Sequence, residues 1–296
     1  MRLYIIGNGF DLNHGMKTSY GDYREFLLEN DPYIVQEYES SQYLEADNWS
    51  AYTKWTDLEN NLEIISEECL ADMAENYYPD MTSERTPGWD DIAIEVDNTF
   101  SFMEPFTQEY FYQWIDAIPV SDKCFRRNDI DVTASFVTFN YTKTLESIYN
   151  IPYENILHIH GSVDDFSSIQ FGTPANDPDE IYPILEKMYS SDEFYNVVYD
   201  PAIQNILACA KRAYKNLEDN FSVLQDFLCQ CGSKIDEVVI MGHSCWGIDE
   251  PYYENIFVPQ LGNAKWYIYV HDNEDKENAE CFVTKYKLKK AVFIEW

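Results

Sequence analysis

Basic residues are scarce in this chain. Its 296 residues contain 20 Lys and Arg but 53 Asp and Glu, which gives a formal net charge of −33 at pH 7. Such a charge repels phosphate backbones and anionic lipid surfaces, so we expect neither nucleic acid nor a membrane as a partner. A compact anionic cofactor is not excluded, because backbone N–H groups at a helix N-terminus supply local positive potential whatever the net charge.

Long apolar runs and paired cysteines are also missing. No stretch approaches the roughly 20 apolar residues that span a bilayer, and the N-terminus lacks the basic and apolar segments of a secretory signal. The seven cysteines show no paired CxxC spacing of the kind that marks a zinc site or a disulfide framework. The sequence therefore predicts a cytoplasmic protein with reduced thiols and no bound metal.

Short β-branched and aromatic runs predict six strands, at residues 3–6, 135–139, 156–160, 237–241, 266–270 and 292–296. Several are continuously apolar rather than alternating, which is typical of strands buried on both faces of a parallel sheet. Helix-like stretches accompany the later strands, at residues 141–149, 202–231, 252–257 and 276–286. This alternation predicts an α/β fold with a Rossmann-like, mostly parallel sheet.

The segment from residue 20 to 131 breaks this pattern, because it contains no convincing buried strand. Apolar residues at three- and four-residue spacing, as between Trp55 and Leu62, predict two or three amphipathic helices there. We therefore predict a nucleotide-binding core at 1–19 and 132–296, with a large helical insertion at 20–131 after the first strand. Residues 79–91 are the best candidate for a mobile connection within the insertion, and residues 162–179 are expected to form a loop.

The first strand runs directly into a glycine turn at Gly7 and Gly9. Glycines there permit unusual backbone angles and close approach of a phosphate. Leu12 stands where the dinucleotide fingerprint has its third glycine, so a plain tight turn is the alternative. The polar neighbours Asn8 and Asp11 favour a nucleotide ligand.

Polar residues also follow two later strands. Asn140 stands at the end of the strand 135–139, and His160 lies at the exit of the strand 156–160. His158 and His160 are two residues apart, so both are expected on one face of that strand. These positions favour acid/base chemistry or polar contact with a substrate.

A fourth turn, with Gly242, His243 and Ser244, follows the strand 237–241. It partly resembles a nucleophile elbow, but Trp246 replaces the last glycine, which disfavours a serine hydrolase. All four turns come directly after predicted strands. A parallel sheet would gather them at one edge, around a single cleft.

Together these segments resemble the AbiH family of bacterial phage-defence proteins. The resemblance rests on GNGFDLNHG at 7–15, WTDLE at 55–59, FNYT at 139–142, HIHG at 158–161 and GHS at 242–244. More distantly, the glycine loop, the strand-end Asn and the His-Gly pair are similar to SIR2-like proteins, which bind NAD in a Rossmann-like domain. The zinc-ribbon spacing of sirtuin deacylases is absent from the sequence, which disfavours a deacylase.

The resemblance implies NAD as substrate or ligand, and a hydrolase that releases nicotinamide. Asn140 would orient the nicotinamide ribose or an attacking water, and His160 would act as general base or as a partner of a ribose hydroxyl. Gly242 and Ser244 would face the adenosine side. The cofactor phosphates and the adjacent ribose would lie among Gly7, Asn8, Gly9, Phe10 and Asp11.

Two other interpretations remain open at this point. One is a metal-dependent hydrolase that uses His158 and His160 together with His243 and Asp249. The other is a sensor that binds NAD or ADP-ribose without turnover. As partners we expect a small nucleotide, together with either a phage-derived trigger or further copies of the chain.

Overall fold

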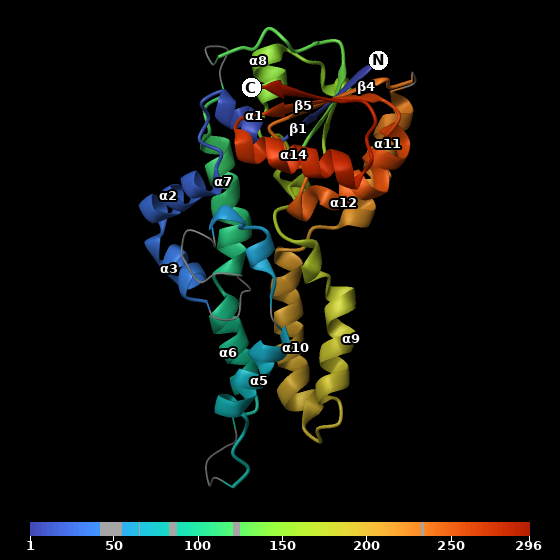
Figure 1. Cartoon of the computed structure of the whole chain (residues 1–296). Coiled ribbons are helices and arrows are strands. Elements are labelled where there is room, and N and C mark those ends of the chain that lie inside the picture. The colour runs from blue at the N-terminus through green and yellow to red at the C-terminus, as the bar shows by residue number, and fades with distance from the viewer. Residues whose placement is uncertain (42–54, 65, 83–87, 121–124, 232–233) are drawn as a thin grey trace. The chain divides into compact units, whose positions relative to one another are not determined.

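The computed structural model describes residues 1–41, 55–64, 66–82, 88–120, 125–231 and 234–296 (Figure 1). The chain forms two compact units. The sheet unit comprises Met1–Asp22, Tyr112–Ile169 and Asn216–Trp296, and the helical unit comprises Tyr23–Phe111 and Gln170–Lys215. Part of the predicted mobile connection, residues 83–87, lies outside the described residues.

The sheet unit is built on six parallel strands in the order β3-β2-β1-β4-β5-β6. The strands are β1 (Arg2–Ile6), β2 (Ser135–Thr138), β3 (Ile156–His158), β4 (Glu237–Met241), β5 (Lys265–Val270) and β6 (Ala291–Glu295). All six correspond to predicted strands, and the predicted α/β class with a parallel sheet is confirmed. The strand order reverses between β1 and β4, which is where open α/β sheets bind ligands.

Burial on both faces explains the continuous apolar runs of the central strands. Leu3, Ile5, Val238 and Ile240 are fully buried, in a core that also contains Trp266. The helices of this unit are α1 (Asn8–Asn13), most of α7 (Tyr110–Ala117), α8 (Thr144–Tyr149), α11 (Leu217–Gln230), α12 (Glu250–Tyr252), α13 (Val258–Leu261) and α14 (Asn273–Lys285). Short 3₁₀ or π turns lie at η3 (Tyr153–Asn155), η4 (Phe166–Ser168), η6 (Gly247–Asp249) and η7 (Tyr253–Phe257).

Residues 20–131 contain more helices than the two or three predicted there. The helical unit takes most of these helices and adds others from residues 170–215. Its helices are most of α2 (Tyr20–Asn30), α3 (Pro32–Ser40), α5 (Ser66–Tyr77), α6 (Asp91–Phe100), α9 (Pro178–Tyr189) and α10 (Tyr195–Arg212), with η1 (Asn60–Leu62), η2 (Pro105–Glu109) and η5 (Pro174–Asn176) between them. Their core is aromatic: Phe106 packs against Tyr23, Tyr38 and Trp55. Among the helices of the described segments, none is both long and apolar enough to cross a membrane.

Residues 170–215 differ from the sequence-based division, because they pack in the helical unit rather than with the sheet. Residues 112–131, from the predicted insertion, belong instead to the sheet unit. Helix α9 begins inside the predicted loop 162–179, and its remaining residues had no predicted helix. Pro178 stands at its first position, where the missing N–H costs nothing, and the Asp177 side chain caps it by accepting the Asp179 N–H at 2.9 Å.

The predicted helix 202–231 is interrupted, so its two parts are α10 and α11. Between them, the Lys215 N–H donates to the Thr173 carbonyl and the Thr173 N–H donates to the Ala213 carbonyl. This pairing competes with helical hydrogen bonds. Asn216 then starts α11, because its side chain accepts the Asp219 N–H at 3.2 Å.

A buried ion pair lies within the helical unit. Lys215 is fully buried, and its Nζ donates to the carboxylate of Glu59, which is only 7% exposed. Glu59 belongs to the WTDLE segment, whose Trp55 donates its indole N–H to Glu39 at 2.8 Å. The WTDLE segment therefore packs within the helical unit, and its Glu59 carboxylate is buried in the core of that unit.

We expect Lys215→Met to lower the free energy of unfolding by about 3–5 kcal/mol, because it leaves the Glu59 carboxylate buried without its cation. Urea unfolding checks this, with Lys211→Met as the control, since Lys211 is exposed at the end of the neighbouring α10. The double variant Glu59→Gln/Lys215→Met should recover much of the loss. A double variant as unstable as Lys215→Met alone would contradict the explanation.

Candidate functional site

The turns that leave β1 and β4 are pressed tightly together. The Gly7 N–H donates to the Met241 carbonyl at 3.0 Å, and the Gly9 N–H donates to the Gly242 carbonyl at 2.9 Å. A Cβ on Gly7 would lie 2.5 Å from the Gly242 oxygen. Gly242 itself has φ +64°, and a Cβ there would lie 2.1 Å from the Phe10 nitrogen. The contact between the turns thus accounts for these glycines.

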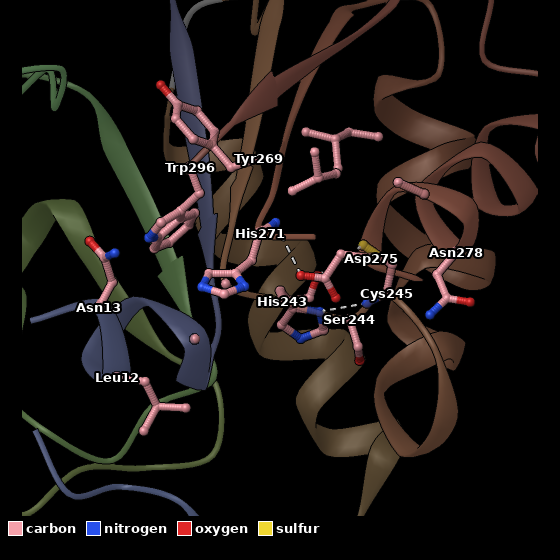
Figure 2. A pocket seen from close by; sticks show the side chains of 15 residues that line it. Leu12, Asn13, His243, Ser244, Cys245, Tyr269, His271, Asp275, Asn278 and Trp296 are labelled. Atoms are coloured by element: carbon pink, nitrogen blue, oxygen red, sulfur yellow. Dashed lines mark hydrogen bonds between the residues drawn. The ribbon is translucent and has the colours of Figure 1, made fainter. Parts of the chain in front are cut away.

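A pocket of about 610 Å³ opens beside these turns at the carboxyl edge of the sheet. Figure 2 shows side chains from α1, the β4 turn, the end of β5 and α14 around it. Its lining consists of Gly9, Leu12, Asn13, Gly242, His243, Ser244, Cys245, Ile268, Tyr269, Val270, His271, Asp275, Asn278, Ala279 and Trp296. Three of the predicted site residues, namely Gly9, Gly242 and Ser244, are thereby brought together.

The other predicted site residues do not line this pocket. Asn8 is exposed, and its side chain donates to the Thr18 carbonyl at 2.8 Å. Phe10 is fully buried against His14 and Tyr149. Gly7 lies in the contact between the turns. Asp11, Asn140 and His160 lie on the side of the sheet edge toward β2 and β3, and each has a distinct set of partners.

Asp11 ties α1 to the turn after β2. It is 1% exposed and accepts hydrogen bonds from the hydroxyls of Thr142 and Thr144, the latter at 2.7 Å. Asn140 Nδ2 also bridges the two turns by donating to the Gly7 carbonyl at 3.1 Å. Burial raises the pKa of Asp11, while the threonine hydroxyls oppose that rise. Asp11 and Asn140 therefore join the ends of β1 and β2.

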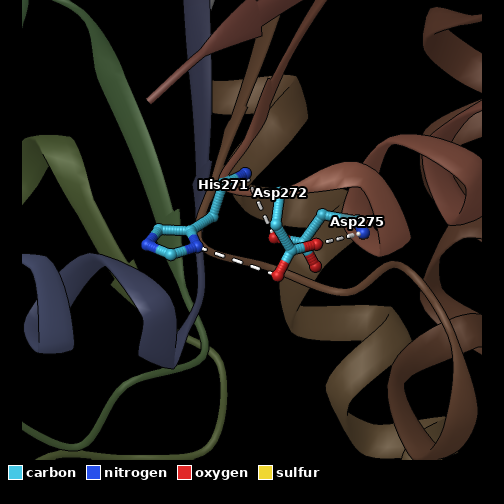
Figure 3. Close-up of side chains that lie close together, drawn as sticks. All are labelled: His271, Asp272 and Asp275. Atoms are coloured by element: carbon cyan, nitrogen blue, oxygen red, sulfur yellow. Dashed lines mark hydrogen bonds and ion pairs between the residues drawn. The ribbon is translucent and has the colours of Figure 1, made fainter.

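Three exposed groups after β5, His271, Asp272 and Asp275, form the only set of potential metal ligands found among the described residues (Figure 3). Their ligand atoms lie within 4.8 Å of one another. Asp272 already caps α14 by accepting the Asp275 N–H at 2.9 Å, and Asp275 accepts the His271 N–H at 3.1 Å. Helix capping accounts for this arrangement, so we assign no metal to it.

His158 and His160 face different partners. His158 uses Nδ1 toward the Asn140 carbonyl at 3.0 Å and Nε2 toward Glu146 at 2.8 Å. His160 Nε2 lies 3.2 Å from the Tyr252 hydroxyl. The two imidazoles therefore do not converge, so they form no joint pair of ligands for the metal-dependent alternative.

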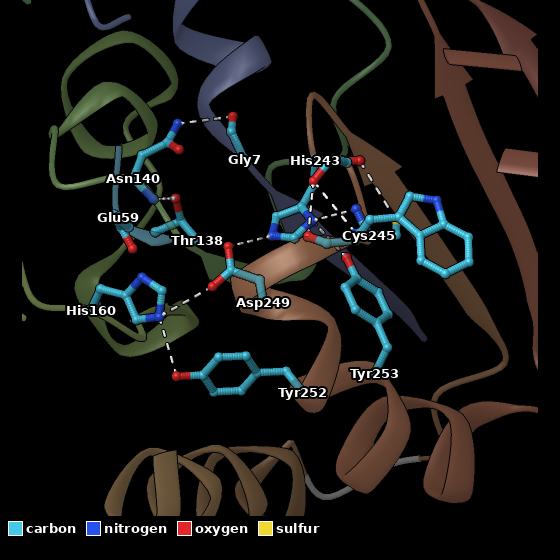
Figure 4. A network of polar contacts seen from close by, with 12 residues as sticks. Gly7, Glu59, Thr138, Asn140, His160, His243, Cys245, Asp249, Tyr252 and Tyr253 are labelled. Carbon is cyan, nitrogen blue, oxygen red and sulfur yellow. Dashed lines mark hydrogen bonds and ion pairs between the residues drawn. The ribbon is translucent and has the colours of Figure 1, made fainter. Parts of the chain in front are cut away.

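His160, His243, Asp249 and Tyr252 form what we call the Asp249 cluster (Figure 4). One carboxylate oxygen of Asp249 lies 3.6 Å from His160 Nε2, and the other lies 3.4 Å from His243 Nε2. The two histidine side chains are 3% exposed and that of Asp249 is 19% exposed. Asp249 is thus the most accessible side chain of the cluster, although its Oδ1 is buried, and it is flanked by two imidazoles.

The tautomer of His243 follows from its backbone contact. Its Nδ1 accepts the Cys245 N–H at 3.1 Å, so a neutral His243 carries its proton on Nε2, which faces Asp249. The Asn220 side chain donates to the Tyr252 hydroxyl at 2.9 Å and holds the other end of the cluster. His243 also lines the pocket, so it belongs to both the pocket and the cluster.

A family model described as bacteriophage abortive infection AbiH matches residues 3–270. The chain belongs to the AbiH family. Every segment on which the resemblance rested lies within the matched range. Family membership indicates a role in phage defence by abortive infection.

Further comparisons, with curated proteins and with solved structures, found no match to this chain. The more distant similarity to SIR2-like proteins is not reproduced by the comparisons. NAD therefore remains a proposal for this AbiH protein.

Sequence reasoning missed the contribution of the last two strands to the pocket of this AbiH protein. Tyr269, His271 and Trp296 line it from the ends of β5 and β6, and Asp275 does so from α14. The carboxyl ends of parallel strands meet at one edge of a sheet, and His271 directly follows β5. The same reasoning could therefore have predicted His271 at the site. No motif marked Trp296 or Asp275, because their positions depend on strand order.

We expect Gly242→Ala to be much more destabilising than Gly15→Ala, although both glycines have positive φ. At Gly15 a Cβ meets nothing within 4 Å, so only the left-handed backbone is strained, at a cost of about 1–2 kcal/mol. At Gly242 the clash with Phe10 adds about 1–3 kcal/mol. Thermal or urea unfolding measures both; equal losses would contradict the close contact of the turns.

The raised pKa of Asp11 predicts a pH effect on stability. Because the folded state favours the protonated carboxyl more than the unfolded state does, Asp11 contributes most to stability at low pH. Its contribution falls as the pH rises from the unfolded pKa, about 3.9, through the higher folded pKa. The free energy of unfolding of the wild type minus that of Asp11→Asn should therefore decrease between pH 4.5 and pH 7.5. An increase over that interval would show that the threonine hydrogen bonds outweigh burial.

Proposed function

We propose that this AbiH protein acts in phage defence by hydrolysing the nicotinamide N-glycosidic bond of NAD. The main support for the proposal is that His243 lines the pocket and also lies against Asp249. A pocket at the β1/β4 switch point is the usual place for a nucleotide in such a fold. A cluster of acid/base groups directly beside it provides the chemistry.

The reaction consumes one water for each NAD. The bond between ribose C1′ and the nicotinamide nitrogen breaks, and its electron pair leaves with neutral nicotinamide. The water oxygen bonds to C1′ and releases one proton, so the products are nicotinamide, ADP-ribose and a proton. The ribose passes through an oxocarbenium-like transition state, which a nearby carboxylate stabilises.

Asp249 is the residue best suited to that role within the sheet unit. Its side chain is 19% exposed despite a buried Oδ1, whereas the imidazoles on either side of it are nearly buried. It can therefore face the ribose while His243 and His160 hold its orientation. In this proposal His160 receives the released proton through Asp249 rather than by direct contact with the substrate.

Asn140 has a supporting role in this scheme. Its side chain donates to the Gly7 carbonyl and so fixes the turn that follows β1. We therefore assign Asn140 as a positioning residue. Gly9, Gly242 and Ser244 keep the contacts with the nucleotide that the resemblance implied, since all three line the pocket.

Asp249→Asn should reduce nicotinamide release by about 10²- to 10⁴-fold, because the variant removes the negative charge and the acid/base group but keeps the shape. His160→Ala should have a similar effect. The measurement is chromatography and mass spectrometry of purified protein incubated with NAD, repeated with extracts of phage-infected cells. Asp164→Asn is the matched control, since that carboxylate is 53% exposed and pairs with Lys143 outside the cluster.

Phage protection by the same variants is the second readout. Wild-type protein that leaves NAD intact both alone and in infected cells would disprove the hydrolase. Full protection by both Asp249→Asn and His160→Ala would remove these residues from the mechanism.

A nucleotide sensor is the second candidate, and the burial of both imidazoles favours it, since a base with a 3% exposed side chain has little access to substrate. A sensor would be stabilised by NAD or ADP-ribose without releasing nicotinamide. Thermal unfolding with and without each ligand, combined with the product analysis, separates the two functions.

A further inference from the structure

One wall of the pocket is an aromatic corner. The rings of Tyr269 and Trp296 meet edge to face, with centroids 5.8 Å apart and planes at 89°. The Arg127 guanidinium lies 5.3 Å from the Tyr269 centroid and 5.0 Å from the Trp296 centroid. Since Arg127 covers one side of the indole and Trp296 lines the pocket, the other side of the indole is available to a flat ligand.

Polar contacts on the side away from the pocket hold two members of this corner, Arg127 and Tyr269. Arg127 pairs with Asp129 at 2.7 Å, and the Tyr269 hydroxyl donates to the same carboxylate at 2.9 Å. The charge of Arg127 is therefore neutralised by Asp129. Two fixed perpendicular rings suit a planar heteroaromatic base, which can stack on one ring and meet the edge of the other.

The polar part of the pocket carries one side-chain carboxylate, that of Asp275. Among the 15 residues that line it, all in the described part of the chain, none is Lys or Arg. Asp275 and Asn278 line it from α14, and the Asp275 carboxylate is exposed. A carboxylate accepts hydrogen bonds from ribose hydroxyls, whereas it repels a phosphate group in the same position.

We infer that this pocket binds a nucleoside moiety whose ribose carries free hydroxyls, with the base against Trp296 and the ribose facing Asp275. The inference rests on the proposed function and specifies its substrate: a dinucleotide with an unphosphorylated adenosine ribose, NAD rather than NADP. The nicotinamide half then extends past His243 toward the Asp249 cluster.

Calorimetric titration of the whole chain with adenosine and 2′-AMP tests the inference directly. Adenosine should bind at least 10-fold more tightly than 2′-AMP, because the added phosphate meets Asp275 without a compensating cation. Trp296→Ala should weaken adenosine binding by at least 5-fold, while Trp296→Phe, which keeps a flat ring, should retain most of it. Tyr153→Ala is the matched control, because Tyr153 is a 69% exposed aromatic residue of the same unit.

Asp275→Asn tests the selectivity. The amide keeps an oxygen that can accept the His271 N–H, so the turn should be preserved, while the repulsion of phosphate is removed. We expect the preference for adenosine over 2′-AMP to fall to less than 3-fold. An unchanged preference, equal binding of the two ligands by the wild type, or unaltered adenosine binding by Trp296→Ala would each overturn the inference.

Nicotinamide release separates this inference from the proposed function. If adenosine shows the expected pattern but NAD is not cleaved, the subsite stands and the hydrolase fails. If NAD and NADP are cleaved with equal kcat/KM, the hydrolase stands and the selectivity fails.

Discussion

The close contact between the turns after β1 and β4 is the constraint on which the candidate site depends. Two neighbouring parallel strands end at the same level, with Ile6 opposite Met241. Their turns then satisfy each other's backbone groups, through hydrogen bonds from Gly7 and Gly9 to the carbonyls of Met241 and Gly242. Only glycine permits this approach, because any Cβ would enter the facing backbone. The pocket forms beside the contact, where Gly9 and Gly242 expose their backbone to a ligand.

Buried polar groups extend this arrangement toward β2 and β3. Asp11 and Asn140 link the first two turns, and the Asp249 cluster links β3 to the segment after β4. Each of these groups is costly to bury without partners, and each has partners in the segment that follows another strand. The carboxyl edge of the sheet is therefore held by polar contacts between turns, while apolar packing holds its interior. His243 connects the two regions, since it contacts both the pocket and Asp249.

Basic residues, which are scarce in the chain, are also missing from the described lining of the pocket. Its lining, within the described residues, contains no Lys or Arg, and Asp275 adds a carboxylate. Aromatic rings and hydrogen-bonding groups are therefore the means by which it can hold a ligand, rather than charge pairing. In the helical unit, by contrast, the buried cation of Lys215 is balanced by Glu59.

The sequence by itself determined the six strands, the α/β class and the family, because continuous apolar runs and short motifs are local properties of the chain. It also identified Gly9, Gly242 and Ser244, which follow their strands directly. Helix α9 was missed, because Pro178 is typical of a loop, although here it follows the capping Asp177 and stands at the first helical position. Only the tertiary structure decided that His160 lies with Asp249 rather than with His158, and that Tyr269, Asp275 and Trp296 line the pocket. The physical reason is strand order: placing β4, β5 and β6 beside β1 joins side chains that are far apart in sequence, and no local pattern encodes that order.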